Sequence, residues 1–195
     1  MTYERPPRPI LVVVDDAVLE QHVHAATSDA APDEVTPPVS PGGSWTAARV
    51  GWLRDFHHGR RAGLDAPAGE ATWAIVVDET VVGSVRLKHT DEPDLLETGI
   101  WLTRRVLGRG LGPAVMVAVL QQATVLGAAR VRADTTAGNA AAPSVLRRLG
   151  FTLTVGKDGH DVQATVSLLP RAPREHQWTN LERDTVLSAG NRLQS

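Results

Sequence analysis

Three glycines in a short, arginine-rich stretch are the residues of this chain whose spacing most clearly indicates chemistry. Gly108, Gly110 and Gly112 lie between an apolar run and a long apolar segment that begins at Pro113. Backbone N–H groups beside glycine can approach a ligand closely, and the N-terminus of a following helix favours negative charge. Three positive side chains lie in the same stretch: Arg104, Arg105 and Arg109. The stretch therefore predicts a pyrophosphate site, although tight turns use glycine in the same way.

Two common nucleotide-binding motifs are absent from the sequence. A P-loop requires a glycine, four spacer residues and then Gly-Lys-Ser/Thr, and a dinucleotide-binding fold requires Gly-x-Gly-x-x-Gly near its first strand. Residues 108–112 have neither spacing, and they follow the fourth predicted strand. The predicted anion site therefore belongs to another class of protein.

Composition narrows the class further. The chain has 195 residues and a net charge of −2, which favours one compact domain and gives no overall electrostatic reason to bind nucleic acid or an acidic membrane. It has no cysteine, which excludes disulfides, thiolate metal sites and an acyl-cysteine intermediate. The apolar run at 10–14 is too short for a signal-peptide core or a membrane span, so we expect a cytoplasmic protein. The histidines lack metal-binding spacing, and we expect no metal.

Apolar periodicity and turn residues predict alternating strands and helices. The predicted strands are residues 10–14, 71–77, 81–89, 95–102, 129–134, 151–155 and 162–168, and the predicted helices are residues 17–26, 45–61, 113–126 and 139–149. Asp15 and Asp16 are expected to cap the first helix and Ser44 the second, with a loop at 29–43 between them. This order predicts an α+β domain over residues 1–170. Residues 171–195 form a tail with a weak helical pattern, which would cover a homodimer interface or the domain's own surface.

The elements and motifs together resemble one family. A strand, the Arg-x-x-Gly-x-Gly pattern from Arg105 to Gly110 and a long helix resemble the acyl-CoA signature of the GNAT superfamily of N-acetyltransferases. Asn139, followed by Leu149-Gly150-Phe151, matches a second signature of that family. The resemblance covers about residues 8–170. It implies the GNAT fold, a mixed and mostly antiparallel sheet flanked by helices, with acetyl-CoA as cosubstrate.

The resemblance also implies a branch of the family and a set of cofactor-binding residues. Residues 97–102 and 139–151 are similar to the branch that includes ribosomal-protein N-terminal acetyltransferases and several antibiotic-modifying enzymes. In the family the strand at 95–102 separates from its neighbour and exposes backbone groups to pantetheine. The residues implied to bind the cofactor are Ile100, Leu102, Thr103, Arg105, Leu107, Gly108, Arg109, Gly110, Leu111, Gly112 and Asn139.

Amide formation requires a neutral amine, so a base must accept a proton directly or through water. The resemblance implies Glu97 for this role, and the alternative is an outward-facing carboxylate at a strand end. The tyrosine that protonates the thiolate in many relatives is replaced by Leu146, and the serine used by others is replaced by Ala142. Ser144 could serve instead, or it could only help the helix to start. Water could also protonate a thiolate whose conjugate acid has a pKa of about 8.5.

The acceptor is predicted from charge and aromatic residues. Residues 1–100 contain 16 acidic and 8 basic side chains, whereas residues 101–195 contain 6 acidic and 12 basic ones. An acidic first half favours a cationic acceptor, unless these charges are only solvated surface. Trp45, Trp52, Asp55 and Trp73 could line its pocket, or the aromatic residues could be core. We predict transfer of acetyl to a small polycationic amine, with an aminoglycoside-type antibiotic as the leading acceptor. The alternatives are N-terminal acetylation of a ribosomal or other protein and a non-catalytic acyl-CoA-binding or sensing module.

Overall fold

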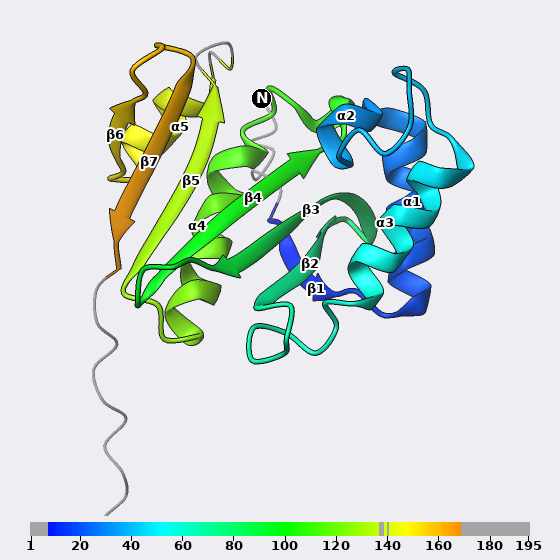
Figure 1. Cartoon of the computed structure of the whole chain (residues 1–195), viewed down its shortest axis with the longest axis horizontal. Coiled ribbons are helices and arrows are strands. Elements are labelled where there is room, and N and C mark those ends of the chain that lie inside the picture. Colours follow the sequence, from blue (N-terminus) through cyan, green and yellow to red (C-terminus); the bar gives the residue numbers. More distant parts are fainter. Residues whose placement is uncertain (1–7, 137–138, 140, 169–195) are drawn as a thin grey trace, which may run out of the picture.

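One mixed sheet of seven strands runs through the domain, in the order β1-β2-β3-β4-β5-β7-β6 (Figure 1). The structure, a computed structural model, describes residues 8–136, 139 and 141–168. The strands are β1 (Ile10–Val13), β2 (Glu70–Val77), β3 (Thr80–His89), β4 (Leu95–Leu102), β5 (Arg130–Thr136), β6 (Thr152–Val155) and β7 (Asp161–Ser167). Among these strands, β4 and β5 alone pair in parallel. The predicted α+β class with a mostly antiparallel mixed sheet is confirmed.

Helices flank this sheet. They are α1 (Asp16–Asp29), α2 (Pro32–Val35), α3 (Ala47–His58), the 3-10 helix η1 (Arg104–Val106), α4 (Leu111–Val125) and α5 (Ala142–Arg148). None of these helices has the length and apolar content that crossing a membrane requires, as far as residues 8–136, 139 and 141–168 show. The predicted helical tail at 171–195 lies outside the described residues, and so does the predicted domain boundary at residue 170.

The structure confirms the predicted N-cap of α1 and shows a different N-cap for α3. Asp15 caps α1 as predicted, because its Oδ1 accepts a hydrogen bond of 2.8 Å from the Val18 N–H. Ser44 was the wrong cap for α3, since the Thr46 hydroxyl accepts from the Arg49 N–H and the helix begins at Ala47.

The single turn of α2 lies inside the predicted loop at 29–43. It forms because Pro32 occupies the first helical turn and the Glu34 carboxylate accepts from the Ala31 N–H at 3.1 Å. This turn is short, but it carries one wall of the cavity described below.

The two C-terminal helices begin at positions other than those predicted. α4 begins at Leu111, two residues before Pro113, behind an N-cap at Gly110. α5 begins at Ala142 rather than at Asn139, whose side-chain oxygen accepts a hydrogen bond of 3.2 Å from the Ala142 N–H. Both helix starts lie at the gap between β4 and β5.

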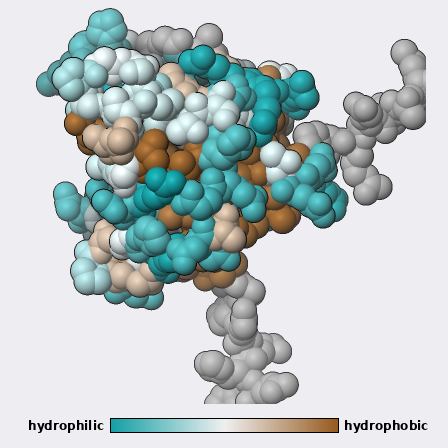
Figure 2. Space-filling view, turned by 90° about the vertical axis from the view of Figure 1, so that its right-hand side faces the viewer, coloured by the Kyte–Doolittle hydropathy of each residue, from teal (hydrophilic) through white to brown (hydrophobic). Residues whose placement is uncertain are grey.

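Apolar side chains pack on both faces of the sheet. On one face α4 contributes Val115 and Val119 to a cluster with Ile75 of β2, whereas on the other Leu19 of α1 packs with Leu53 of α3. Figure 1 shows α1 and α3 together on the side of the sheet away from β6 and β7. Figure 2 looks onto this side and shows a largely hydrophilic surface with a band of apolar residues between. The helices α1 to α3 therefore form a separate layer over β2 to β4.

Candidate active site

The parallel strands β4 and β5 separate part-way along their length. Leu95 to Thr98 pair with Arg130 to Ala133, but β4 continues to Leu102 and β5 to Thr136 without pairing to each other. The edge of β4 that faces β5 therefore has free backbone groups beyond Thr98. This separation opens the sheet at the N-termini of α4 and α5.

A cavity of about 300 Å³ fills the opening between β4 and β5. Ile100 and Leu102 of β4, Met116 of α4, Thr135 of β5 and Leu146 of α5 are among its lining residues. Most of these side chains are apolar, and the cavity leads to the start of α4. We call it the cofactor cavity.

The loop before α4 has the conformation that an anion site requires. Gly108 and Gly110 both have a φ of +75°, which other residues adopt only with strain. No side chain caps the N-terminus of α4, so its first N–H groups remain available to a ligand. The Arg105 N–H donates to Asp29 Oδ2 at 3.0 Å, which holds this loop against the end of α1. These residues fit a pyrophosphate at the helix N-terminus.

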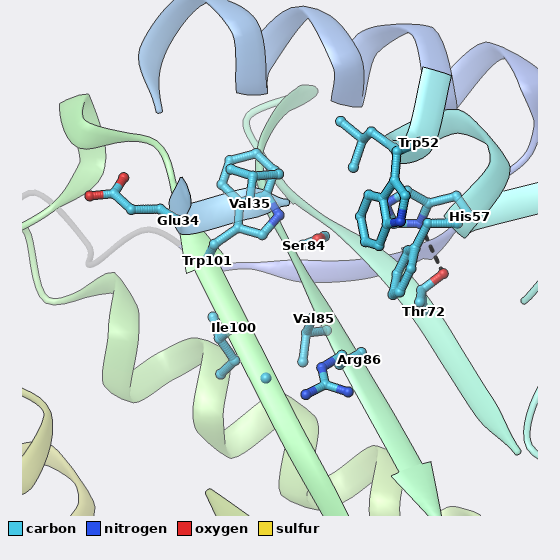
Figure 3. Close-up of a pocket in the computed structure, with 13 residues that line it drawn as sticks. Glu34, Val35, Trp52, His57, Thr72, Ser84, Val85, Arg86, Ile100 and Trp101 are labelled. Carbon is cyan, nitrogen blue, oxygen red and sulfur yellow. Dashed lines mark hydrogen bonds between the residues drawn. The ribbon is translucent and has the colours of Figure 1, made fainter. Parts of the chain in front are cut away.

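A second cavity, of about 290 Å³, lies between α2, α3 and strands β2 to β4 (Figure 3). Trp52 and Phe56 of α3 stack in its wall with their ring centroids 4.8 Å apart, and Trp101 of β4 faces it as well. This cavity shares Gly99 and Ile100 with the cofactor cavity. We call it the acceptor cavity, because it reaches β4 where the strand leaves β5.

A chain of ion pairs crosses the sheet beside the acceptor cavity. Arg86 bonds to Glu70 at 3.0 Å and to Glu97 at 2.8 Å, and Glu97 also bonds to Arg132 at 2.7 Å. Arg86 passes directly over Gly99, where a Cβ would come within 2.7 Å of its Nε. Glycine at this position therefore lets the guanidinium of Arg86 reach from β3 to Glu97 on β4.

The ion pairs control the charge of Glu97. Partial burial acts to raise the pKa of Glu97, but the hydrogen bond from Arg132 and the charge of Arg86 outweigh it and hold the pKa below its ordinary value. Both carboxylate oxygens are bonded to guanidinium groups. Glu97 is therefore anionic at neutral pH.

Two buried histidines pack against each other at the acceptor cavity, and one of them lines it. His57 lines it, with Nδ1 at 3.0 Å from Thr72 Oγ1, and its ring meets that of His22 edge-on at 4.4 Å. Burial lowers the pKa of His57 to about 4 and that of His22 to about 3. Neither ring nitrogen of His22 has a hydrogen-bond partner among the described residues. Both imidazoles are therefore neutral at physiological pH.

The profile of the acetyltransferase (GNAT) domain family matches residues 19–152. The chain belongs to the GNAT acetyltransferases. It is an acetyl-CoA-dependent N-acetyltransferase, so the prediction of an enzyme with acetyl-CoA as cosubstrate is confirmed. No protein of curated function matches the sequence of this GNAT domain.

Solved structures share the fold of this GNAT domain. The GNAT domain of S. lividans PAT has a TM-score of 0.62 at 18% identity, over 83% of this chain and 90% of that chain. The ribosomal L7/L12 alpha-N-protein acetyltransferase RimL in complex with coenzyme A has a TM-score of 0.63 at 18% identity, over 83% and 94%. The microcin C7 self immunity acetyltransferase MccE in complex with acetyl-CoA and AMP has a TM-score of 0.62 at 14% identity, over 83% and 93%.

The predicted cofactor-binding residues of the GNAT domain fall into three groups. The first lines the cofactor cavity and comprises Ile100, Leu102, Leu107, Gly112 and Asn139. The second lies on the exposed loop and comprises Arg105, Gly108, Arg109 and Gly110. The third is buried and comprises Thr103 and Leu111. The first group lines the cavity, the second lies at the N-terminus of α4, and the third has almost no exposed surface for a ligand to contact.

The predicted acceptor residues lie in different places. Trp52 lines the acceptor cavity, and Asp55 is not among its lining residues. Trp45 packs near α1 with its Nε1 donating to the Ala30 carbonyl at 3.0 Å. Trp73 belongs to the core cluster on the α4 face of the sheet. Ser144 is exposed in the first turn of α5 and does not line the cofactor cavity.

Sequence reasoning missed Trp101 and His57 of the acceptor cavity. Trp101 could have been found from strand alternation, since it lies on the same face of β4 as Glu97 and Gly99. His57 could have been found from helical spacing, because it lies four residues after the fully buried Leu53. Its neighbour His58 is exposed. A histidine pair that is adjacent in sequence thus has one buried and one solvated member.

Proposed function

We propose that this GNAT enzyme acetylates the primary amine of a small cationic acceptor bound in the acceptor cavity. The observation that carries the proposal is that the acceptor and cofactor cavities share Gly99 and Ile100, where β4 leaves β5. An amine that enters from the α3 side would therefore meet an acetyl group that enters from the α4 side.

The chain's own residues suit acetyl-CoA, which supplies an acetyl group activated as a thioester. The N-terminus of α4 behind Gly108 and Gly110 would hold the pyrophosphate through backbone N–H groups. The free edge of β4 at Ile100 and Leu102 would pair with pantetheine and polarise the acetyl carbonyl. These backbone donors are fixed by the sheet and need no reorganisation during the reaction.

The wall of the acceptor cavity suits a cationic amine. Trp52 and Trp101 present aromatic rings, whose faces attract ammonium groups by about 0.5–2 kcal/mol each. Phe56 supports Trp52 by stacking, and its own ring already carries the guanidinium of Arg60 at 3.6 Å from the centroid. Glu34 adds a carboxylate to the lining. A cavity of about 290 Å³ is at the lower end of the range for ligand sites, so it suits one ring of a larger molecule. An aminoglycoside-type antibiotic, which presents amines on small rings, is our leading acceptor.

An N-terminal α-amine of a protein is the second candidate. The fold is shared with RimL, the ribosomal L7/L12 alpha-N-protein acetyltransferase. An α-amine has a pKa of about 7.7–8.0, so a larger fraction is neutral at pH 7 than for an alkyl amine, and less help from a base is needed. The acceptor cavity, to which α2 contributes Glu34 and Val35, would have to admit a peptide backbone.

A non-catalytic acyl-CoA-binding module is the third candidate. Leu146 lines the cofactor cavity where many relatives carry a tyrosine acid, and Ser144 points elsewhere. The assignment of Glu97 as general base remains a prediction. Each of its oxygens accepts one hydrogen bond from a guanidinium, which lowers the basicity of the carboxylate but leaves a lone pair for a proton. Glu97→Gln tests it: loss of turnover with retained CoA affinity supports the base, whereas unchanged turnover contradicts it.

The release of CoA thiol with a panel of amines separates the three candidates. The panel contains aminoglycosides, short peptides with free N-termini and simple diamines, each at saturating acetyl-CoA. We expect the highest kcat/KM with an aminoglycoside. Turnover only with peptides would contradict the antibiotic acceptor and support the second candidate. CoA binding without turnover of any amine would contradict both and support a binding module.

A further inference from the structure

Three ionisable side chains line the acceptor cavity in the part of the chain that the structure describes: Glu34, His57 and Arg86. Arg86 stays protonated at any physiological pH and cannot accept a proton. Glu34 is bonded to the Ala31 N–H, and Figure 3 shows its carboxylate pointing away from His57 and Arg86. Glu97 does not line the cavity and is bonded to two guanidinium groups. His57 is the remaining side chain that can receive a proton from a bound amine.

We propose that His57 is a catalytic residue that takes the proton from the acceptor nitrogen as the new amide bond forms. The inference rests on the proposed function, amine acetylation at the junction of the two cavities, and it names the proton acceptor for that reaction. It replaces Glu97 in the role that the sequence predicted for that residue.

The surroundings of His57 fix the ring for this role. Its Nδ1 lies 3.0 Å from Thr72 Oγ1, and the side chain is 2% exposed, so the ring cannot turn freely. When Nδ1–H donates to the Thr72 hydroxyl, the lone pair is on Nε2, which is the tautomer a base requires. The rings of His22 and His57 also pack in a T-shaped arrangement, with their centroids 4.4 Å apart, which further restricts the His57 ring.

Burial, helped by nearby positive charges, keeps His57 neutral. Burial is the largest influence on its pKa, the positive charges of Arg60, Arg61 and His58 act in the same direction, and Glu70 acts against them. The neutral ring does not repel an incoming ammonium, and it can accept a hydrogen bond from the amine throughout the physiological range of pH. Because a protonated ring in this site is strongly acidic, it releases its proton as soon as another acceptor is present.

Because the protonated His57 ring gives up its proton readily, the enzyme gains no net proton in the reaction. An acceptor that enters as an ammonium first loses one proton to solvent, because His57, with a pKa of about 4, is too weak a base to remove it. The neutral amine then uses its lone pair to bond to the acetyl carbon, displaces sulfur together with the bonding electron pair, and gives one N–H proton to Nε2 of His57. His57 then passes that proton to the displaced thiolate, directly or through water, because a thiol of pKa about 8.5 binds it far more tightly. The ring ends neutral, the products are an amide and a thiol, and no separate acid is needed at Leu146.

His57→Gln and His58→Gln form a matched pair for the test, because the two histidines are adjacent on α3 and only His57 lines the cavity. Turnover is measured by thiol release with the amine of highest kcat/KM from the panel. We expect His57→Gln to lower kcat by about 100-fold or more, with an unchanged KM for acetyl-CoA, and His58→Gln to resemble wild type. Equal kcat values for the two variants would overturn the proposal.

A second measurement does not depend on turnover. Nitrogen-15 NMR of the wild-type imidazoles at pH 7 should show His57 protonated on Nδ1, and Thr72→Val should weaken this preference and lower kcat several-fold. A ring protonated on Nε2 in the wild-type protein would overturn the proposal even if His57→Gln failed to fold. If the proposed function is wrong, the result differs. The wild-type protein then turns over no amine, whatever the tautomer of His57.

Discussion

Replacement of His22 by leucine is expected to make the protein more resistant to acid. His22 is completely buried in α1, and neither of its ring nitrogens has a hydrogen-bond partner among the described residues. Burial lowers its pKa to about 3, so the folded protein keeps the ring neutral where the unfolded chain protonates it. Leucine has a similar size, fits the surrounding apolar cluster and cannot bind a proton.

The magnitude follows from proton linkage. Between pH 6.5, where a histidine titrates in the unfolded chain, and pH 3, the unfolded state binds one more proton at this site than the folded state. The free energy of unfolding therefore falls by about 1.4 kcal/mol for each pH unit below 6.5. At pH 5 the wild type should have lost about 2 kcal/mol through His22, and the leucine variant should not have lost it.

Urea titrations followed by circular dichroism at pH 7.5, 6.0 and 5.0 measure this difference. We expect the stability of His22→Leu relative to wild type to increase by about 2 kcal/mol between pH 7.5 and 5.0, with equal m-values. His24→Leu is the control, because His24 lies on the exposed side of the same helix and should show no such increase. A difference between His22→Leu and wild type that does not change with pH would refute the reasoning.

Three other substitutions test the parts of the site separately. Gly99→Ala places a Cβ 2.7 Å from Arg86 Nε and should lower the free energy of unfolding by about 1.5–3 kcal/mol, the cost of losing one charged hydrogen bond. Unchanged stability in a urea titration would be evidence against the Arg86–Glu97 contact. Arg49→Met removes a fully buried guanidinium that bonds to Asp33, Thr36 and the Gly42 carbonyl. Because α2 then loses these contacts, the KM for the acceptor should rise, whereas the KM for acetyl-CoA should not change. The same variant should lose about 2 kcal/mol or more in a urea titration, and full stability would contradict this role. Gly110→Ala forces alanine to a φ of +75° at the start of α4, which costs about 1–2 kcal/mol, so calorimetry should show CoA binding weakened about tenfold, whereas unchanged affinity would place the pyrophosphate elsewhere.

The cofactor side could be predicted from the sequence because its determinants are local. Glycine at 108 and 110 permits the left-handed backbone found there, and the helix that follows presents its N-terminus wherever the rest of the chain lies. The strand at 95–102 was predicted with the same bounds as β4. Only the point at which β4 leaves β5 depends on tertiary structure, and there the family resemblance supplied what spacing could not.

The acceptor side could not be predicted in the same way, because its cavity is assembled from α2, α3 and three strands. Alternation along a strand shows that two faces exist but not which helices cover each one, so Trp73 was placed with the acceptor although it packs under α4. Glu97 was assigned from the family resemblance, which places a glutamate at this position of the strand. Its two arginine partners come from β3 and β5, and no spacing in the sequence indicates that they meet on one carboxylate.

The short helix α2 shows a further limit of local patterns. Several prolines and a glycine pair make residues 29–43 look like a loop, and a helix of one turn leaves almost no periodicity. Arg49, an ordinary surface residue by composition, is instead buried beneath this segment and bonds to its carbonyl groups. The buried Arg49 side chain thus holds the α2 wall of the acceptor cavity, and the sequence pattern does not predict this wall.

A crystal structure of the protein with CoA and its best amine acceptor tests the central claim most directly. We expect the sulfur to lie beside Ile100 in the cofactor cavity and the amine nitrogen to lie in the acceptor cavity, within hydrogen-bonding distance of His57 Nε2. An acceptor bound on another surface, or separated from the sulfur by the β4 strand, would contradict it.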